Sequence, residues 1–433
     1  MIATLARRLP FFYGWVVVGV AFMTMAIAVN ARTAFSLLFP AMLDEFGWDR
    51  AVTAGAFSFG FMVSAFLSPL VGRLMDRRGP VWVMQLAVAA TVSGLLLATL
   101  ATRPWHIYLT LGVLVGGGAT AAGYTGQALY LPHWFLRRRG LAISIAYAGA
   151  GAGSIVLLPL TQWLIGGAGW RTACVTLAVI TLVVLVPLNL LLARQPQDLG
   201  LSPDGDTAAQ ALARRRVHVV DPAWAAVDWT LARAMRTARF WWIALGYFGM
   251  LFAWYAVQVH QTKYLQEIGF SAAAAGWELG AVSLVGVPGQ IAAGALSDRI
   301  GREPVWALGC AGFVATYLLL IALGEWPSTG LLALMILAQG LVGYSTTSVL
   351  SPITAEIFEG RHFGAIFGML MVCAITGGAA GPFVVGLLHD ITGSDTWGFI
   401  VGAVASLVSA LAIWIAAPRK VRRVGQVKEA VLF

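Results

Sequence analysis

The sequence predicts an all-α membrane protein with twelve transmembrane helices arranged as two related six-helix halves. The chain has 433 residues, of which 59% are hydrophobic and only 11% are charged, and its mean hydropathy is +0.81. Soluble proteins carry about 25% charged residues, and a membrane-spanning helix needs roughly 20 apolar residues. Many runs of that length occur, whereas the alternating segments of about 10 residues that are typical of a transmembrane barrel do not.

A repeated motif divides the chain into two halves. Gly72–Gly79 and Gly294–Gly301 both read G-x-L-x-D-R-x-G, and each is followed within a few residues by Val-Trp. The two copies begin 222 residues apart, which is about half of the chain. Each copy is a polar turn between two long apolar runs. A repeat at this spacing indicates an internal duplication.

Twelve apolar runs are long enough to cross a membrane, and we expect each to form one helical span. Their approximate ranges are 12–38, 51–71, 81–101, 105–130, 141–164, 171–193, 240–263, 273–293, 304–323, 330–353, 363–388 and 396–417. With the N-terminus inside, 23 of the 28 Lys and Arg residues fall on the cytoplasmic side, and only Arg50, Arg103 and Arg171 fall in outer loops. The positive-inside rule therefore predicts a multi-pass cell-membrane protein with both termini in the cytoplasm, in the inner membrane if the source is bacterial.

The predicted domains are a first six-helix half at 1–193, a cytoplasmic central loop at 194–239, and a second six-helix half with a short basic tail at 240–433. The central loop contains Arg214–Arg216 and then an expected interfacial helix at about 229–240, which leads into the seventh span. Arg233, Arg236 and Arg239 are spaced three apart and would share one face of that helix. The alternative is that these arginines only anchor the loop on the cytoplasmic side.

Composition and motifs argue against several classes of function. The net charge of +9 does not indicate a nucleic-acid partner, because the cations lie in loops on one side of the membrane. Cys174, Cys310 and Cys373 lie in separate apolar runs and are too scattered for a disulfide framework or a metal site. The sequence contains no G-x-x-x-x-G-K-[ST] phosphate loop, so ATP is not expected to drive the protein. Without a nucleophile–base or metal-ligand pattern, we expect neither an enzyme nor a bound cofactor.

Together these features resemble the major facilitator superfamily of transporters. They are the twelve spans, the long middle loop and the motif repeated between spans 2 and 3 and between spans 8 and 9. A second repeat supports the resemblance, since Trp134–Gly140 before span 5 is similar to Phe358–Gly364 before span 11. The resemblance covers almost the whole chain. It implies the major facilitator fold, with two pseudo-symmetric six-helix halves, and a secondary transporter that works by alternating access.

Finer features are similar to the bacterial branch of the monocarboxylate transporters and oxalate:formate exchangers. They are the segments Tyr13–Trp15, Leu43–Trp48, Val259–Tyr264 and Gly269–Ser271. This resemblance implies that the substrate is a small organic anion such as a monocarboxylate. Carriers of this kind usually place an arginine in span 8, one turn before the motif glycine, where this chain has Gln290. A glutamine donates hydrogen bonds but does not supply a full positive charge.

Arg32 is the leading candidate for an anion anchor in place of the missing span 8 cation. It lies well inside predicted span 1, close to Asn30, and an ionisable residue within a bilayer is costly and marks a functional site. The alternative is that Arg32 extends to the outer headgroups or forms a structural ion pair. The full set of predicted substrate-binding residues is Arg32, Asn30, Tyr124, Gln127, Tyr255, Gln290, Tyr344 and Thr376. For the polar residues near mid-depth, the alternative role is hydrogen bonding between helices.

Two further groups of residues are predicted to drive and to gate transport. Glu278 is the only acidic residue that the predicted boundaries place inside a span, and with His260 and Lys263 it forms the candidate proton-coupling group. The alternative for Glu278 is a fixed outer ion pair. The motif residues Asp76, Arg77, Asp298 and Arg299 are expected to hold an inward gate closed rather than to contact substrate.

The sequence therefore predicts a secondary active transporter that moves a small organic anion by alternating access, coupled to protons. We expect it to work as a monomer in the lipid bilayer, without a cofactor or a nucleic-acid partner. The first alternative is an efflux carrier for an apolar or weakly cationic small molecule, which Gln290 and the aromatic candidates favour. A non-transporting sensor on the same scaffold is an alternative from a different class.

Overall fold

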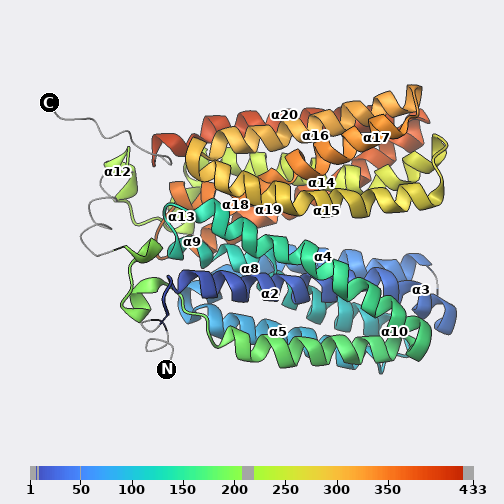
Figure 1. Cartoon of the computed structure of the whole chain (residues 1–433), viewed down its shortest axis with the longest axis horizontal. Helices are drawn as coiled ribbons and strands as arrows, with labels where there is room; N and C mark the ends of the chain where they lie inside the picture. The colour runs from blue at the N-terminus through green and yellow to red at the C-terminus, as the bar shows by residue number, and fades with distance from the viewer. Residues whose placement is uncertain (1–5, 7–8, 49, 207–218, 423–433) are drawn as a thin grey trace. The chain divides into compact units, whose positions relative to one another are not determined.

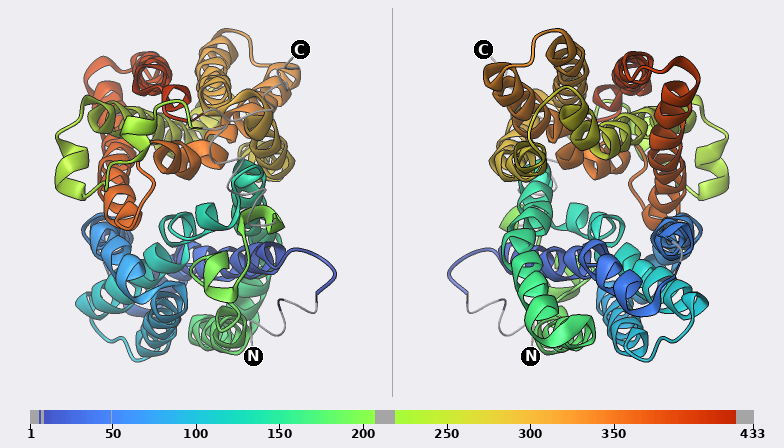
Figure 2. Two further views of the ribbon diagram at one scale, coloured as in Figure 1. Left: turned by 90° about the vertical axis from the view of Figure 1, so that its left-hand side faces the viewer. Right: turned by 90° about the vertical axis from the view of Figure 1, so that its right-hand side faces the viewer.

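The computed structural model describes residues 6, 9–48, 50–206 and 219–422, so Arg214–Arg216 lies outside the described residues. The chain divides into two compact units. Unit 1 comprises Met1–Leu136 and Ile145–Ala208, and unit 2 comprises Arg137–Ser144 and Ala209–Phe433. The described chain is almost entirely helical, and the long helices within each unit run side by side (Figure 1). Views along the helix axes show that each unit is a helical bundle (Figure 2).

The first half of the chain contains nine α-helices and three shorter helical segments within the described residues. In chain order they are α2 (Gly14–Thr33), α3 (Phe35–Phe46), α4 (Arg50–Arg78), α5 (Pro80–Ala98), α6 (Pro104–Ile107), the π-helix η1 (Tyr108–Val115), α7 (Gly116–Ala122), α8 (Tyr124–Ala128), α9 (Leu131–Trp134), α10 (Arg139–Asn189) and the 3-10 turns η2 (Pro196–Leu199) and η3 (Pro203–Gly205). The first residues of α10, up to Ser144, belong to unit 2.

The second half follows the same plan after two short helices. Its described elements are α12 (Pro222–Ala225), α13 (Leu231–Met235), α14 (Ala238–Glu267), α15 (Ala272–Ile300), α16 (Arg302–Glu325), α17 (Thr329–Ile336), the π-helix η4 (Leu337–Gly343), α18 (Ser345–Ile357), α19 (Phe363–Thr392), α20 (Thr396–Ala416) and the 3-10 turn η5 (Pro418–Lys420).

The helices account for the predicted number of membrane spans. Within the described chain, 11 helical stretches are long and apolar enough to cross a membrane. One of them, α10, is 51 residues long and contains two spans, because Gly169 has the non-helical angles φ 83° and ψ 161°. When the two parts of α10 are counted separately, the twelve predicted spans are confirmed.

Three spans that were predicted as continuous helices are interrupted. Span 1 passes from α2 to α3 at Ala34 and continues to Phe46, beyond its predicted end at residue 38. Spans 4 and 10 each contain a π-helix, η1 and η4 respectively. A π-helix is rare and is frequently found at a functional site. These runs are apolar on all sides, so their hydrophobic pattern does not distinguish a π-helix from an α-helix.

The repeated motif makes the same turn in both units. Its last glycine is Gly79 in one copy and Gly301 in the other, with φ of 77° and 101° respectively. Glycine adopts this region without the steric cost that a β-carbon would bring. Pro80 then starts α5, at a position where its missing N–H costs nothing. Each copy of the motif therefore ends one long helix and starts the next.

The end of the central loop differs from the predicted interfacial helix. Helix α13 ends at Met235, and α14 begins at Ala238, so Arg233 and Arg239 belong to different helices and Arg236 lies between them. The break has a local cause, because the Thr237 hydroxyl accepts a hydrogen bond from the Phe240 N–H and caps α14. The three arginines therefore do not share one helical face.

Candidate functional site

Arg32 lies at the interruption of span 1, in the last turn of α2. Its Cζ is 3.9 Å from the centre of the Phe61 ring, which is the geometry of a cation–π interaction. Its Nη1 donates to the Ser64 hydroxyl at 3.3 Å. A cation in the last turn of a helix also interacts favourably with the negative end of the helix dipole. Neighbouring residues of α4 therefore hold a half-buried guanidinium at a helix end inside unit 1.

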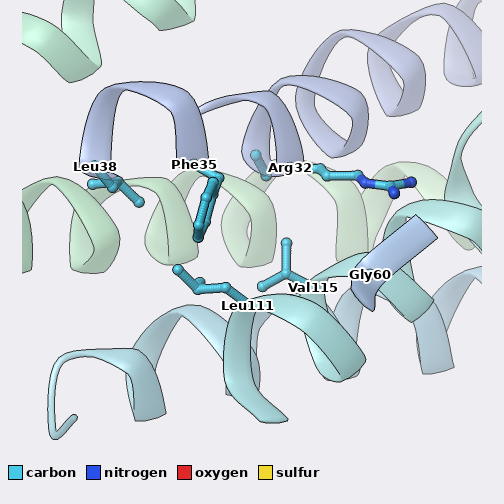
Figure 3. A pocket seen from close by; sticks show the side chains of 7 residues that line it. Arg32, Phe35, Leu38, Gly60, Leu111 and Val115 are labelled. Atoms are coloured by element: carbon cyan, nitrogen blue, oxygen red, sulfur yellow. The ribbon is translucent and has the colours of Figure 1, made fainter. Parts of the chain in front are cut away.

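A small cavity adjoins this guanidinium. It is lined by Ala31, Arg32, Phe35, Leu38, Gly60, Leu111 and Val115. Phe35 points toward Leu111 and Val115 of η1, while the guanidinium of Arg32 extends on the side of Gly60 (Figure 3). The π-helix of span 4 and the interruption of span 1 thus meet at one cavity. Its lining combines a single cation with apolar side chains, and its volume of about 10 Å³ corresponds to roughly one water molecule.

Two other predicted substrate residues of unit 1 are used in helix packing. Asn30 is 2% exposed, and its Nδ2 donates to the carbonyl oxygens of Ala26 at 2.8 Å and Ala150 at 2.9 Å, which joins α2 to α10. Gln127 is fully buried, with its Nε2 donating to the Ala122 carbonyl at 2.7 Å. Its Oε1 accepts a hydrogen bond from the hydroxyl of Tyr130. The contact of Asn30 favours the alternative role that polar residues have between membrane helices, whereas Gln127 bonds within its own span.

Tyr124 differs from these two residues because it is 41% exposed at the start of α8. The Tyr147 ring packs edge-on against its ring, with 4.9 Å between the centroids. Tyr147 also donates its hydroxyl hydrogen to the Tyr124 carbonyl oxygen at 2.9 Å. Tyr124 is therefore held by its backbone and its ring face, and remains a candidate for substrate contact.

The predicted substrate residues of unit 2 fall into two groups. Gln290 is 6% exposed and donates to the Thr347 hydroxyl at 2.5 Å, which ties α15 to α18. Tyr344 stacks on Trp254 with 4.1 Å between the ring centroids. The ring of Tyr255, the residue after Trp254 in α14, lies against Gly378 of α19, two residues beyond the exposed Thr376. The structure therefore brings Tyr255 and Thr376 to one pair of helices.

Among the described residues, no hydrogen bond or ion pair joins any two of the three predicted proton-coupling residues. His260 Nε2 lies 3.0 Å from the Pro382 carbonyl oxygen of α19. Lys263 is exposed and pairs with Glu267 at 3.1 Å, one turn further along α14. Glu278 is 2% exposed, and neither of its carboxylate oxygens has a hydrogen-bond partner among the described residues. Of the three, Glu278 alone is a buried carboxylate.

Asp298, one of the predicted gating residues, has three hydrogen-bond donors around its carboxylate. Its carboxylate accepts hydrogen bonds from the backbone N–H groups of Gly140 and Leu141, each at 2.9 Å. Arg302 Nη1 donates to the same carboxylate at 2.6 Å. The first N–H groups of a helix have no partner within it and favour an anion. Asp298 therefore caps the start of α10. The other motif residues, Asp76, Arg77 and Arg299, lie near the ends of α4 and α15, and both of these arginines are exposed.

Arg302 and Glu356 form a buried ion pair that the sequence analysis missed. Arg302 is 1% exposed and Glu356 is 3% exposed, and Arg302 Nε donates to Glu356 Oε1 at 2.7 Å. Glu356 lies beyond the predicted end of span 10 at residue 353, because α18 continues to Ile357. The signal was present in the sequence, since Arg302 directly follows the motif glycine.

Comparisons with known proteins agree with this architecture. A family model described as the Major Facilitator Superfamily matches residues 20–315 and 243–431. Monocarboxylate transporter 13 of Bos taurus is 28% identical over 408 residues, which cover 94% of this chain and 89% of that protein. Monocarboxylate transporter 11 of Mus musculus is also 28% identical, over 415 residues that cover 94% of this chain and 88% of that protein.

A solved structure shares the fold at lower sequence similarity. It is the proton:xylose symporter XylE of the major facilitator superfamily, bound to 6-bromo-6-deoxy-D-glucose. Its TM-score is 0.77 at 13% identity, over 93% of this chain and 95% of that chain. With the family model matching most of the sequence and a helical fold of twelve spans, the chain belongs to the major facilitator superfamily and is a multi-pass membrane transporter.

Proposed function

We propose that this transporter carries a small organic anion of the monocarboxylate class across the cell membrane by alternating access, coupled to protons. In this proposal the protein works as a monomer, with both termini in the cytoplasm. The similarity to monocarboxylate transporters over 94% of the chain supports the substrate class. The observation that carries the proposal is the guanidinium of Arg32 at the edge of a small apolar cavity.

The cavity residues suggest how such a substrate would bind. A guanidinium presents two parallel N–H donors that match the two oxygens of a carboxylate, and such charged hydrogen bonds are short and strong. The apolar walls made by Phe35, Leu111 and Val115 would receive a short hydrocarbon tail. Arg32 of span 1 would then supply the positive charge for the anion that Gln290 of span 8 does not supply. Tyr124 is the further side chain that we propose for substrate contact.

Coupling and gating are assigned to different residues. Glu278 would take up the proton, because it is a buried carboxylate in a membrane helix, where an unpaired charge is costly. Asp298 would act as a gate residue by holding the start of α10 in one state of the cycle and releasing it in another. Both residues lie in unit 2, whereas the Arg32 cavity lies in unit 1.

Uptake of labelled acetate, lactate and butyrate into proteoliposomes tests the proposal. Wild-type protein should accumulate at least one of these acids when an inward proton gradient is imposed. Hydrogen bonds to a charged group are worth about 1.5–3 kcal/mol, and about 1.4 kcal/mol is tenfold, so Arg32→Gln should lower kcat/KM about 10- to 100-fold. Arg32→Lys keeps the charge without the two-pronged geometry, so it should retain intermediate activity.

Arg103→Gln is the matched control, because it removes an exposed arginine that lies between α5 and α6, away from the cavity. It should leave uptake unchanged. Absence of carboxylate uptake by folded wild-type protein would reject the monocarboxylate assignment and move the search to effluxed apolar or weakly cationic compounds. Full activity of Arg32→Gln would reject Arg32 as the anchor while leaving the substrate class standing.

A further inference from the structure

Three buried polar side chains in unit 2 have groups without protein partners. They are Gln261 of α14, Glu278 of α15 and Gln339 of η4, which are 0%, 2% and 1% exposed. Within the described chain, no hydrogen-bond partner exists for either amide atom of Gln261, either carboxylate oxygen of Glu278, or Oε1 of Gln339. Buried polar groups are almost always hydrogen-bonded, so five unpartnered atoms on three helices call for an explanation.

The three helices meet at a tightly packed junction. A β-carbon on Gly340 of η4 would lie 2.5 Å from the Val282 carbonyl oxygen of α15, so the two backbones are nearly in contact. The Tyr344 ring lies against Gly286, one turn along α15, and stacks on Trp254 of α14 at 4.1 Å. These contacts fix α14, α15 and η4 against one another.

The three polar residues lie on the same side of this junction, toward the end of the unit where α14 ends and α15 and α17 begin. Glu278 is one turn from Val282, and Gln339 is the neighbour of Gly340, so each lies near this close contact along its own helix. Gln261 is seven residues from Trp254, two turns along the same face of α14. At 1.5 Å per residue, Gln261 and Glu278 are each roughly 9 Å from the end of their helix, and Gln339 roughly 15 Å.

Their chemistry points to a small cation. A carboxylate and two amide oxygens are hard oxygen ligands of the kind that bind small cations. Burying a carboxylate without a compensating positive charge is also costly. We propose that Glu278, Gln261 and Gln339 form the binding site for the monovalent coupling cation of this transporter. The cation is either a proton, carried on Glu278 and shared with the amide oxygens, or a sodium ion held by the same oxygens. This inference rests on the proposed function as a coupled transporter, and it adds Gln261 and Gln339 to the site.

The neighbouring charged groups are occupied elsewhere. On α14, His260 contacts the Pro382 carbonyl and Lys263 pairs with Glu267. The stretch Thr329–Gly343 of α17 and η4 contains no titratable side chain. Other titratable side chains on the packed helices lie at a helix end or already have a partner. Glu325 lies at the end of α16, and Tyr317 donates a hydrogen bond to the Ala253 carbonyl oxygen. Arg302 and Glu356 pair with each other at the opposite end of the unit. Among the described residues of unit 2, no protein cation pairs with Glu278, so a bound cation would supply its counter-charge.

The test compares gradient-driven accumulation with equilibrium exchange of labelled carboxylate in proteoliposomes. One arm applies an inward proton gradient in choline buffer, and the other applies an inward sodium gradient at equal pH. Gln261→Leu and Gln339→Leu should lower accumulation at least tenfold and leave exchange within twofold of wild type. Glu278→Gln should behave likewise. Gln266→Leu is the matched control, because it changes an exposed glutamine on the same helix, and it should leave both activities unchanged.

The cation is identified by the gradient, proton or sodium, that makes wild-type protein accumulate labelled carboxylate. If the leucine variants lose exchange and accumulation equally, the glutamines serve packing and the proposal fails. A substrate-free measurement separates this result from failure of the proposed function. Purified protein is monitored by infrared spectroscopy for the protonated carboxyl band of Glu278, and by binding of labelled sodium. If Gln261→Leu shifts the carboxyl band or the binding of labelled sodium, the cation site is supported even if no carboxylate is transported. Absence of both signals in folded wild-type protein overturns it.

Discussion

At the scale of single residues, Arg302 shows how a buried charge organises the end of unit 2. It contacts two carboxylates, Asp298 at 2.6 Å and Glu356 at 2.7 Å, and donates to the Ser297 hydroxyl at 2.6 Å. Removing a charge from water costs several kcal/mol, so such a residue persists only when its partners compensate it. Because Asp298 also caps α10, Arg302 supports the proposed gate without being part of a substrate site.

Replacing Arg302 therefore tests this organisation. Arg302→Met keeps the length of the side chain but leaves two carboxylates facing each other in a buried position. We expect the free energy of unfolding to fall by about 3–5 kcal/mol, as for other broken buried pairs. Chemical unfolding in detergent micelles measures this change. Arg299→Met is the control, since Arg299 is exposed three residues earlier, and it should change stability by less than about 0.5 kcal/mol. Equal effects of the two variants would contradict the assignment.

At the scale of helices, both units use the same small-residue contact. Gly149 and Gly153 of α10 lie against the backbone of α2, where an added β-carbon would overlap the carbonyl oxygens of Phe22 and Ala26. Gly377 and Gly381 of α19 lie in the same way against the Phe248 and Phe252 carbonyls of α14. Small residues spaced four apart let membrane helices approach closely. The duplication seen in the motif therefore extends to the packing of individual helices.

A larger side chain at one of these glycines should separate the helices. We expect Gly153→Val to lower the free energy of unfolding by about 1–3 kcal/mol, the usual cost of overpacking. Gly167→Val is the matched control on the same helix, because no atom lies within 4 Å of a β-carbon at that position. Thermal unfolding of the two purified variants in one detergent compares them directly. A control that is destabilised as much as Gly153→Val would show that valine itself, and not the close contact, is responsible.

The sequence predicted the spans but not their interruptions. Apolar length and the repeated motif are sufficient to locate twelve helices, and the last glycine of the motif marks the turn at Gly79 and Gly301. The π-helices were not predictable, because they lie in uniformly apolar runs whose pattern does not distinguish a π-helix from an α-helix. Arg32 was found because a charge inside an apolar run is conspicuous. By contrast, nothing in the sequence distinguishes an Asn30 that bonds to backbone carbonyls from one that would face a substrate.

At the scale of the whole molecule, the charge pattern predicts the orientation in the membrane. Cations are concentrated in the segments that join spans on one side, and one of them, Arg419, pairs with Glu303 at 3.4 Å. The positive-inside rule depends on the short loops near span ends, and not on net charge. It requires the turn after α5 and the segment before α14 to lie on opposite sides of the membrane.

Labelling of single cysteines tests this orientation. Cys174, Cys310 and Cys373 would be replaced by alanine, and one cysteine introduced at Thr102 or at Arg236, both of which are exposed. In intact cells, a membrane-impermeant maleimide should label Thr102→Cys and should leave Arg236→Cys unlabelled until the membrane is permeabilised. The reverse pattern would place both termini outside and overturn the predicted topology. Labelling of both sites in intact cells would require an even number of spans between them, whereas the structure has three candidate crossings there, the α6–α9 stretch and the two parts of α10.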